Sequence, residues 1–137
     1  MLGVESHDLR LMEEAAKGIL GPHVLHSLSK GVDIVGDIAV LRIPQLLESA
    51  RFEIAEKLLA RLANVRVVLR QTGPVESSFR TRRLEWLAGE KRTETLHREY
   101  GCQYRLDLNA VYFSPRLSHE RKRIAGLVSK GECVVNF

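Results

Sequence analysis

The chain has 137 residues, of which 45% are hydrophobic and 28% charged, with a net charge of +4. This composition is typical of one compact soluble domain or two small ones, and it excludes a disordered chain. No stretch approaches the 18 apolar residues of a membrane-spanning helix, and the N-terminus lacks the apolar core of a secretory signal. Cys102 and Cys133 are too few for a disulfide scaffold and too far apart for a CxxC metal pair, so we expect a cytoplasmic protein.

The charge is unevenly distributed along the chain. Residues 1–60 contain 6 Lys or Arg and 9 Asp or Glu, whereas residues 61–137 contain 15 and 8. Arginine presents a planar fork of donors that matches phosphate, so this excess favours a polyanionic partner such as nucleic acid. A solvated basic surface without a ligand gives the same pattern, and charge alone does not separate the two.

Hydrophobic periodicity and helix-breaking residues divide the first half of the chain into five predicted elements. Gly21-Pro22 separates two N-terminal helices, and Gly36-Asp37 interrupts a stretch rich in Val and Ile. Leucines at helical spacing after Pro44 predict the longest helix. In chain order we predict helices over 8–20 and 22–28, one or two strands over 32–43, a helix over 45–62 and a strand over 65–69.

The second half of the chain predicts strands followed by a basic helix. A turn at Gly101 joins the two strands of a hairpin, and the second of these alternates apolar and polar residues. Ser118 is placed to cap a helix that ends near Val128. In chain order we predict a loop over 71–78, strands over 81–88, 93–100 and 102–108, a helix over 118–128 and a strand over 132–137.

The end of the sequence allows two interpretations. The stretch 132–137 is mostly apolar, which is typical of a strand buried on both faces. A helix, a glycine turn and a buried strand are how an α/β nucleotide-binding domain begins, with the ligand loop expected next. The alternative is an edge strand that completes the preceding sheet.

No complete catalytic motif is present, because GxGxxG, P-loop and HExxH patterns are absent and the five histidines are scattered. Two clusters lie in the strand region. The loop and strand over 73–83 contain Arg80, Arg82 and Arg83, which suit phosphate or base contact, although on a strand Arg83 points away from the other two. The alternating charges of 92–99 indicate cross-strand pairing.

A third cluster is the stretch Tyr-Phe-Ser-Pro-Arg-Leu-Ser-His-Glu-Arg over 112–121. Ser-Pro predicts a turn, and Glu120 lies in the first turn of the predicted helix with Arg116 and Arg121 on either side in sequence. By residue type alone, this pattern indicates structural electrostatics at the start of a helix.

The stretch 112–121 resembles the archaeal and eukaryotic tRNA (guanine-N1)-methyltransferase family, which modifies the guanosine 3′ of the anticodon. The resemblance covers roughly 32–137. A sister family transfers the aminocarboxypropyl group of S-adenosylmethionine in wyosine synthesis and shares the hairpin, but it usually lacks Pro-Arg-Leu-Ser-x-Glu-Arg, so the methyltransferase is favoured. The further segments that carry the resemblance are Val-Gly-Asp-Ile-Ala at 35–39, Phe-Arg-Thr-Arg at 79–82, Leu-Ala-Gly-Glu at 87–90 and the hairpin sequence at 93–102.

The resemblance implies an α+β fold: a mixed or antiparallel sheet with packed helices, followed by the first helix and strand of a truncated Rossmann-like methyltransferase domain. It implies S-adenosylmethionine as cofactor, tRNA as partner and a monomeric full-length enzyme whose cofactor loop follows Phe137. Asn136 stands where an acidic residue is common in the family, and we expect the 137-residue chain alone to be inactive. The implied parts are a helical N-terminal segment, a tRNA-facing α+β domain and the start of the catalytic domain, over 1–30, 31–110 and 111–137.

The same resemblance assigns roles to individual residues. Glu120 is the general base that removes the N1 proton of guanine, and burial is expected to raise its pKa. Arg80 stabilises negative charge on guanine O6, and Tyr112 lies near the methyl donor. No metal is expected. Nucleic-acid contacts are expected from Arg82, Arg83, Arg116 and Arg121.

Two other interpretations remain open. The chain can be an arginine-rich tRNA-binding module without chemistry of its own. It can also be an incomplete gene product, whose unpaired apolar strand over 132–137 would promote association.

Overall fold

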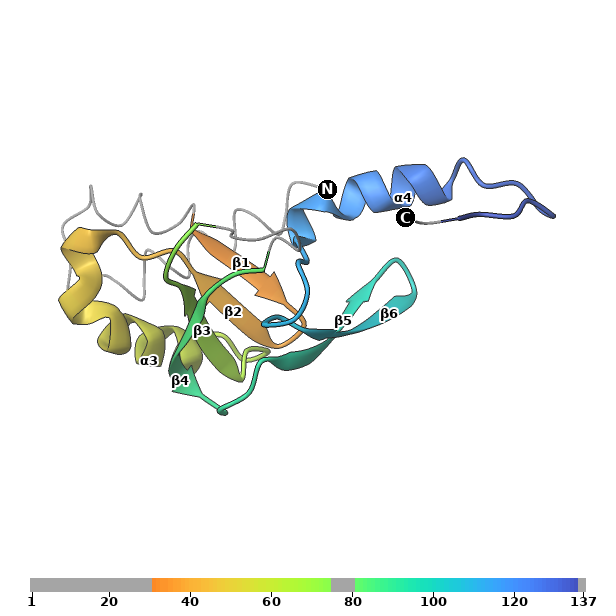
Figure 1. The fold of residues 1–137 in the computed structure, drawn as a ribbon. Helices are drawn as coiled ribbons and strands as arrows, with labels where there is room; N and C mark the ends of the chain where they lie inside the picture. The colour runs from red at the N-terminus through yellow and green to blue at the C-terminus, as the bar shows by residue number, and fades with distance from the viewer. Residues whose placement is uncertain (1–30, 75–80, 136–137) are drawn as a thin grey trace.

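A computed structural model of the chain describes residues 31–74 and 81–135 (Figure 1). These residues form a four-stranded sheet, a two-stranded hairpin and two α-helices, each preceded by a short 3-10 helix. The helices predicted over 8–20 and 22–28 lie outside the described residues. None of the described helices is both long enough and apolar enough to cross a membrane.

The four-stranded sheet has the spatial order β1 (Val32–Val35), β2 (Ile38–Leu41), β3 (Val67–Gln71) and β4 (Leu84–Gly89). β1 and β2 form an antiparallel hairpin, β2 and β3 are parallel, and β4 is antiparallel to β3. All four residues of β2 are buried, as expected for a central strand covered on both faces. The strands predicted over 32–43 and 65–69 are therefore confirmed, whereas the one predicted over 81–88 begins only at Leu84.

The crossover from β2 to the parallel strand β3 consists of the 3-10 helix η1 (Gln45–Ala50) followed by α3 (Arg51–Arg61). The sequence predicted a single helix over 45–62. Over one or two turns a 3-10 helix and an α-helix place their apolar residues at nearly the same spacing, so the sequence pattern does not distinguish them. The predicted apolar stripe covers one face of the sheet, but Leu46, which was expected to belong to it, is 78% exposed. The buried residues on this face are Leu47, Ile54, Leu58 and Leu62 of the predicted stripe, together with Ala55.

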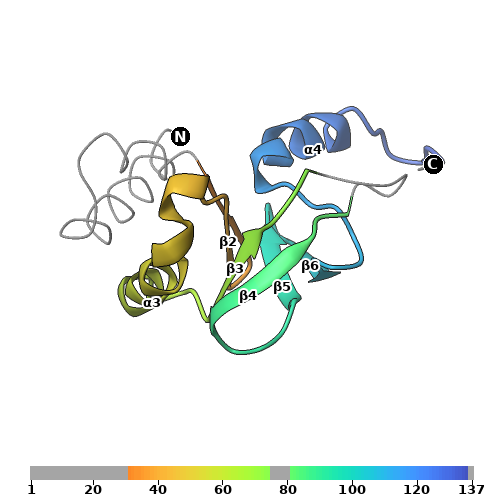
Figure 2. The same cartoon turned by 60° about the vertical axis from the view of Figure 1, so that its left-hand side comes forward.

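The opposite face of the sheet is covered by the hairpin of β5 (Glu94–Glu99) and β6 (Cys102–Asp107) and by the chain that follows it. Figure 2 shows α3 and this hairpin on opposite sides of the four-stranded sheet. The second apolar cluster lies between the sheet and the hairpin. Its buried members are Val35, Ile38, Val40, Val67, Leu69 and Leu108, with Leu84, Leu106 and Phe113 at its edge.

The turn between β1 and β2 is fastened to β5. Gly36 has φ +58, and its N–H donates to Nδ1 of His97 at 3.0 Å. A Cβ at this position would collide with Thr95 Oγ1 and lie 2.8 Å from the carbonyl oxygen of Leu96. Glycine is therefore required at position 36 both by the backbone conformation and by the close approach of the hairpin.

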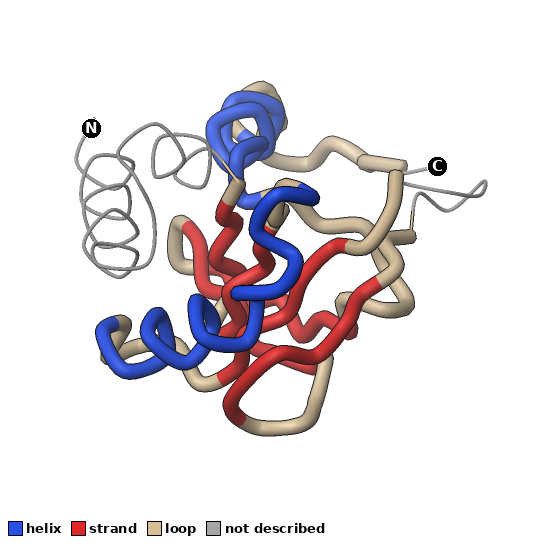
Figure 3. Tube along the Cα trace, turned by 90° about the vertical axis from the view of Figure 1, so that its left-hand side faces the viewer, coloured by secondary structure: helices blue, strands red, loops and turns tan. Residues whose placement is uncertain are grey.

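The basic helix is α4 (Ser118–Ala125), which continues directly from the 3-10 helix η2 (Pro115–Leu117). Figure 3 shows α4 end on above the strands, whereas α3 lies alongside them. The predicted cap at Ser118 is wrong, because this residue already has helical φ −58 and ψ −42 and its N–H donates to the Pro115 carbonyl. A capping residue needs an extended backbone. Ser118 is helical instead, because it continues directly from the 3-10 turn before it.

The strand predicted over 132–137 is not formed in its described part. Residues 132–135 have no strand conformation, and Val134 and Val135 are 65% and 66% exposed. Figure 1 shows this segment beyond α4, away from the sheet and the hairpin. A strand needs a hydrogen-bonding neighbour. Among the described residues no strand lies beside it, so the alternative of an edge strand completing the sheet is also wrong.

Candidate functional site

The stretch 112–121 crosses the junction between the sheet domain and α4. Ser114 is 6% exposed, and its carbonyl oxygen accepts a hydrogen bond from Nη1 of Arg121 at 3.0 Å. The turn of η2 then directs successive side chains to different neighbours. Arg116 and Arg121 were expected beside Glu120, but each is paired with a carboxylate elsewhere in the fold.

Arg121 anchors α4 to the hairpin. Its Nε and Nη2 bind the two carboxylate oxygens of Glu99 at 2.6 and 2.7 Å, and the guanidinium lies 4.4 Å from the ring centre of Phe113. The Glu99 side chain is 6% exposed, and the hydrogen bonds from Arg121 hold its pKa below the ordinary value. This two-pronged pair fixes the position of the helix, so the predicted RNA-binding arginine has a structural role in this conformation.

His97 extends the same network into the core. Its Nδ1 accepts the hydrogen bond from the N–H of Gly36, so the remaining nitrogen Nε2 carries the ring proton. Nε2 lies 3.3 Å from Oε2 of Glu99, whose other contacts are with Arg121. The turn of β1 and β2, the hairpin and α4 are thereby joined through consecutive polar contacts.

A buried carboxylate, Asp33 on β1, gathers three arginines from separate segments. Its side chain is 4% exposed. Oδ1 accepts a hydrogen bond from Nε of Arg116 at 2.8 Å, and Oδ2 accepts one from Nη1 of Arg82 at 3.3 Å. Nη2 of Arg42 lies 3.6 Å from Oδ2. We call Asp33, Arg42, Arg82 and Arg116 the Asp33 cluster; it contains two of the predicted RNA-binding arginines.

Tyr112, the residue expected near the methyl donor, lies against the Asp33 cluster. The guanidinium of Arg82 is 5.4 Å from the centre of its ring, and the side chain is 38% exposed. A half-exposed aromatic ring is suited to stacking on the adenine of a cofactor or on a base of RNA. Among the residues that the structure describes, no glycine-rich loop accompanies it. These residues therefore fit the edge of an S-adenosylmethionine site and not the whole of one.

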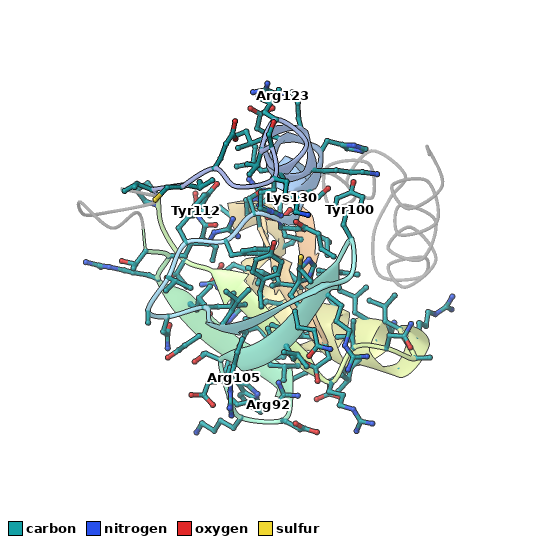
Figure 4. All side chains as sticks on the ribbon, turned by 90° about the vertical axis from the view of Figure 1, so that its right-hand side faces the viewer. Arg92, Tyr100, Arg105, Tyr112, Arg123 and Lys130 are labelled. Atoms are coloured by element: carbon teal, nitrogen blue, oxygen red, sulfur yellow. The ribbon has the colours of Figure 1, made fainter. Side chains whose placement is uncertain are left out.

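Glu120, the expected general base, is exposed and paired within its own helix. Its side chain is 52% exposed, and its two oxygens accept hydrogen bonds from Nη2 and Nε of Arg123 at 2.6 and 2.9 Å. These bonds lower the pKa of Glu120 below its ordinary value. The expectation that burial raises this pKa is wrong for this structure, because the carboxylate is in solvent beside a cation. Figure 4 shows Arg123 at the outer side of α4, well away from Tyr112.

The remaining predicted site residues precede β4. Arg80 lies outside the described residues. Arg83 is exposed, whereas Arg82 is 12% exposed and directed into the Asp33 cluster. Since β4 begins only at Leu84, the strand alternation expected for these arginines does not apply to them.

The charged stretch 92–99 was predicted to pair across the hairpin, but its main ion pairs reach other elements. Nη1 and Nη2 of Arg92 bind the two carboxylate oxygens of Asp37 at 3.0 and 2.6 Å, and Glu99 binds Arg121. Arg92 lowers the pKa of Asp37. Residue spacing gave no signal for a partner 55 positions earlier in the chain.

A wide, open groove runs along β5, next to the loop that follows α3. Among its lining residues are Asp37, Arg92, His97, Arg98 and Arg105. None of the predicted site residues within the described ranges lines it. Figure 4 shows Arg92 and Arg105 at the end of the molecule opposite Arg123. Within the same ranges no group of three or more His, Cys, Asp or Glu side chains is arranged to hold a metal ion.

Comparison with known families accounts for almost the whole chain. Residues 12–93 match the family described as the TYW2 N-terminal domain, and residues 95–137 match the TRM5/TYW2 methyltransferase domain. The chain belongs to the TRM5/TYW2 family. The resemblance found in the sequence and the α+β fold class are confirmed, whereas the division of the chain at 30 and 110 stays a prediction.

The relatives include tRNA methyltransferases named for guanine 37 and for 4-demethylwyosine 37. The chain is 41% identical over 110 residues to the tRNA (guanine(37)-N(1))-methyltransferase Trm5b of Pyrococcus abyssi, covering 80% of this chain and 33% of the relative. It is 44% identical over 111 residues to Trm5b of Methanocaldococcus jannaschii, with the same coverage. It is 36% identical over 109 residues to the tRNA 4-demethylwyosine(37)-methyltransferase Taw21 of Saccharolobus solfataricus, covering 79% and 42%.

Solved structures of Trm5 and TYW2 proteins also align with this chain. A complex of aTrm5 with tRNALeu aligns with a TM-score of 0.68 and 45% identity, covering 74% of this chain and 31% of that one. Trm5b from Pyrococcus abyssi aligns with a TM-score of 0.70 and 38% identity, covering 82% and 34%. TYW2 from P. horikoshii in complex with MeSAdo aligns with a TM-score of 0.61 and 30% identity, covering 85% of this chain and 40% of that one. The chain spans about a third of the length of the Trm5b relatives.

Proposed function

We propose that this chain is part of an S-adenosylmethionine-dependent tRNA (guanine-N1)-methyltransferase that acts on guanosine 37. The observation that carries the proposal is the similarity over 110 and 111 residues to two relatives named for this activity, at 41% and 44% identity. The match of 95–137 to the methyltransferase domain contains the stretch 112–121 and supports the same conclusion. The proposal implies a cytoplasmic enzyme with tRNA as its partner. In it, 31–110 faces the tRNA and 111–137 begins the catalytic domain.

The reaction needs a base, because guanine N1 holds a proton and becomes nucleophilic only when that proton leaves. S-adenosylmethionine supplies the methyl group. Glu120 takes the base role in this proposal, since it occupies the acidic position of the 112–121 stretch. Its present partner is Arg123 in the same helix, in an exposed pair that contributes little stability. We infer that Arg123 leaves the carboxylate when tRNA binds, because a base held at a lowered pKa accepts a proton poorly.

Loss of the N1 proton places negative charge on guanine O6, which a positioned arginine stabilises. Arg80 has this role in the proposal. Tyr112 presents a half-exposed ring beside the Asp33 cluster, where it can stack on the cofactor or on a base. Arg83 and Arg116 supply positive charge for the tRNA backbone, and Arg82 and Arg121 hold the surrounding structure through Asp33 and Glu99.

The test is a chimeric enzyme in which the aligned part of this chain replaces the matching third of the Pyrococcus abyssi Trm5b relative. We expect it to methylate a tRNA transcript with guanosine at position 37 and not the same transcript with adenosine there. Glu120→Gln is expected to lower the rate by at least ~100-fold, the lower end of the effect of a general base.

The matched control is Glu132→Gln, which removes an exposed carboxylate from the same region. Glu132 accepts a hydrogen bond from the N–H of Ser129 and has no role in the proposed chemistry. An unchanged rate is expected for this variant. Full activity of Glu120→Gln would contradict the base assignment, and a chimera that folds but transfers no methyl group would contradict the function.

A further inference from the structure

We propose that the Asp33 cluster is a binding site for an RNA backbone phosphate. Arg42 and Arg116 provide the phosphate contacts, and Asp33 is the positioning residue that holds their guanidinium groups. This inference rests on the proposed function, because it takes tRNA as the ligand. It adds Arg42 and Asp33, to which neither the sequence patterns nor the family resemblance gave a role.

The geometry of the cluster is that of a prearranged cationic site. Asp33 is almost completely buried, and its two oxygens receive guanidinium groups from the chain after β2, the loop before β4 and the η2 turn. The partner in η2 is 83 residues away in sequence. Three flexible side chains from separate segments are thus held at one point before any ligand arrives, which lowers the entropic cost of binding.

The charge of the cluster is unbalanced. One carboxylate faces three guanidinium groups, so the four side chains carry a net charge of +2. Arg82 is 12% exposed and is enclosed between Asp33 and Tyr112, whereas Arg42 and Arg116 are 50% and 52% exposed. Arg42 and Arg116 are therefore the two members of the cluster that a ligand can reach from solvent. A phosphate offers oxygens that match the donor fork of these half-exposed guanidinium groups.

The position of the cluster selects RNA as the source of that phosphate. Asp33 binds the first arginine of the 112–121 stretch directly, and Tyr112 of the same stretch stacks on Arg82. A phosphate here would lie beside an aromatic ring able to stack on a base. Paired backbone and base contacts of this kind are typical of single-stranded nucleic-acid sites such as an anticodon loop.

The first experiment measures binding of the whole 137-residue chain to a tRNA transcript over a range of salt concentrations. Arg42→Gln is expected to reduce the log–log salt slope by about 0.7 to 0.9, the release of counterions from one phosphate. At about 0.1 M salt this corresponds to roughly five- to eightfold weaker binding. Its matched control is Arg66→Gln, which removes one positive charge from a 70% exposed side chain at the other end of the parallel strands and is expected to leave the slope unchanged.

Asp33→Asn separates a positioning role from simple electrostatics. The variant gains one positive charge, so attraction by overall charge alone would tighten tRNA binding. If Asp33 positions Arg42 and Arg116, binding weakens despite the added charge. Thermal unfolding of the same samples checks the fold, and Arg42→Gln stays decisive if Asp33→Asn does not fold.

An unchanged salt slope for Arg42→Gln, or a decrease equal to that of Arg66→Gln, would overturn the inference and leave the proposed function standing. Binding of inorganic phosphate that competes with tRNA in the wild-type chain but not in Arg42→Gln would support it. Absence of tRNA binding by the wild-type chain would overturn it as well, and methylation by the chimeric enzyme then tests the proposed function separately.

Discussion

The two described α-helices are held in place by different forces. α3 buries Ile54, Ala55 and Leu58 against the sheet, whereas α4 has no buried residue and leaves Ile124 51% exposed. α4 is fixed instead by the Arg121–Glu99 pair, by the packing of Arg121 on Phe113 and by its continuity with η2. Apolar burial thus holds α3 in place, whereas directed polar contacts hold α4.

This difference separates the part of the chain with a complete core from the part without one. The sheet, α3 and the hairpin enclose two apolar clusters. The region after η2 exposes a run of large apolar side chains that nothing among the described residues covers. Its members are Ile124, Leu127, Val128, Val134 and Val135. Exposed apolar side chains in such a run are typical of a segment that packs against another surface, and this segment lies within the match to the methyltransferase domain.

The largest predicted effect is on the core attachment of α3. Leu58 is completely buried between α3 and the sheet, so Leu58→Ala removes apolar contact and leaves a cavity. We expect a loss of about 3 to 4 kcal/mol in the free energy of unfolding. Chemical denaturation monitored at Trp86 measures it. A loss below about 1 kcal/mol would show that α3 does not depend on this burial.

The next effect is on the polar attachment of α4. Arg121→Gln leaves Glu99 buried without its cationic partner, and we expect a loss of about 2 to 3 kcal/mol at neutral pH. In the wild type the lowered pKa of Glu99 contributes stability above its unfolded value of about 4.3, and this is lost as the pH falls through the folded value. In the variant this contribution is absent, so its stability should decline less than that of the wild type as the pH falls through the same range.

Unfolding midpoints measured from neutral to acidic pH test this prediction. Arg123→Gln is the matched control, because Arg123 pairs with an exposed carboxylate in the same helix and its loss should change stability little. Equal acid sensitivity of the wild type and Arg121→Gln would contradict the assignment of the Glu99 pair as the anchor of α4.

A smaller effect is expected at the turn that joins the sheet to the hairpin. Gly36→Ala forces a Cβ into Thr95 and Leu96 at a positive φ, so we expect a loss of about 1 to 3 kcal/mol. Gly101→Ala is a useful comparison, because Gly101 has φ +80 but nothing within 4 Å of its added Cβ. The difference between the two variants isolates the contribution of the close approach. Equal losses would show that backbone conformation alone requires glycine.

The smallest effect on stability is expected on the exposed face of the C-terminal region. Leu127 is 68% exposed, so Leu127→Ser should change the free energy of unfolding by less than about 0.5 kcal/mol while reducing self-association at high protein concentration. Sedimentation measures the second quantity. A large destabilisation would show that the segment after α4 is part of the core and would weaken the contrast with α3.

Local patterns predicted the described sheet domain well. Val- and Ile-rich segments around Gly36-Asp37 gave β1 and β2, and the turn at Gly101 gave the β5–β6 hairpin. These elements are set by residues close together in sequence, through alternation and turn chemistry. The strand predicted over 132–137 failed over its described part, because strand formation depends on a neighbouring strand, which a local pattern does not report.

The candidate site was predicted only in part, for a related reason. The stretch 112–121 identified the family, but the partners of its arginines lie far away in sequence: Arg116 binds Asp33 on β1, and Arg121 binds Glu99 on β5. Sequence spacing placed both arginines next to Glu120, which pairs with Arg123 instead. Ion pairs between distant segments depend on topology and register, and no spacing rule contains that information.

The most direct test of the central claim is the identity of the nucleoside made by the chimeric enzyme described above. Digestion of the tRNA product and mass spectrometry should show 1-methylguanosine at position 37. Unmodified guanosine from a folded chimera would contradict the methyltransferase function. A nucleoside carrying the larger aminocarboxypropyl group would contradict it in favour of the wyosine branch.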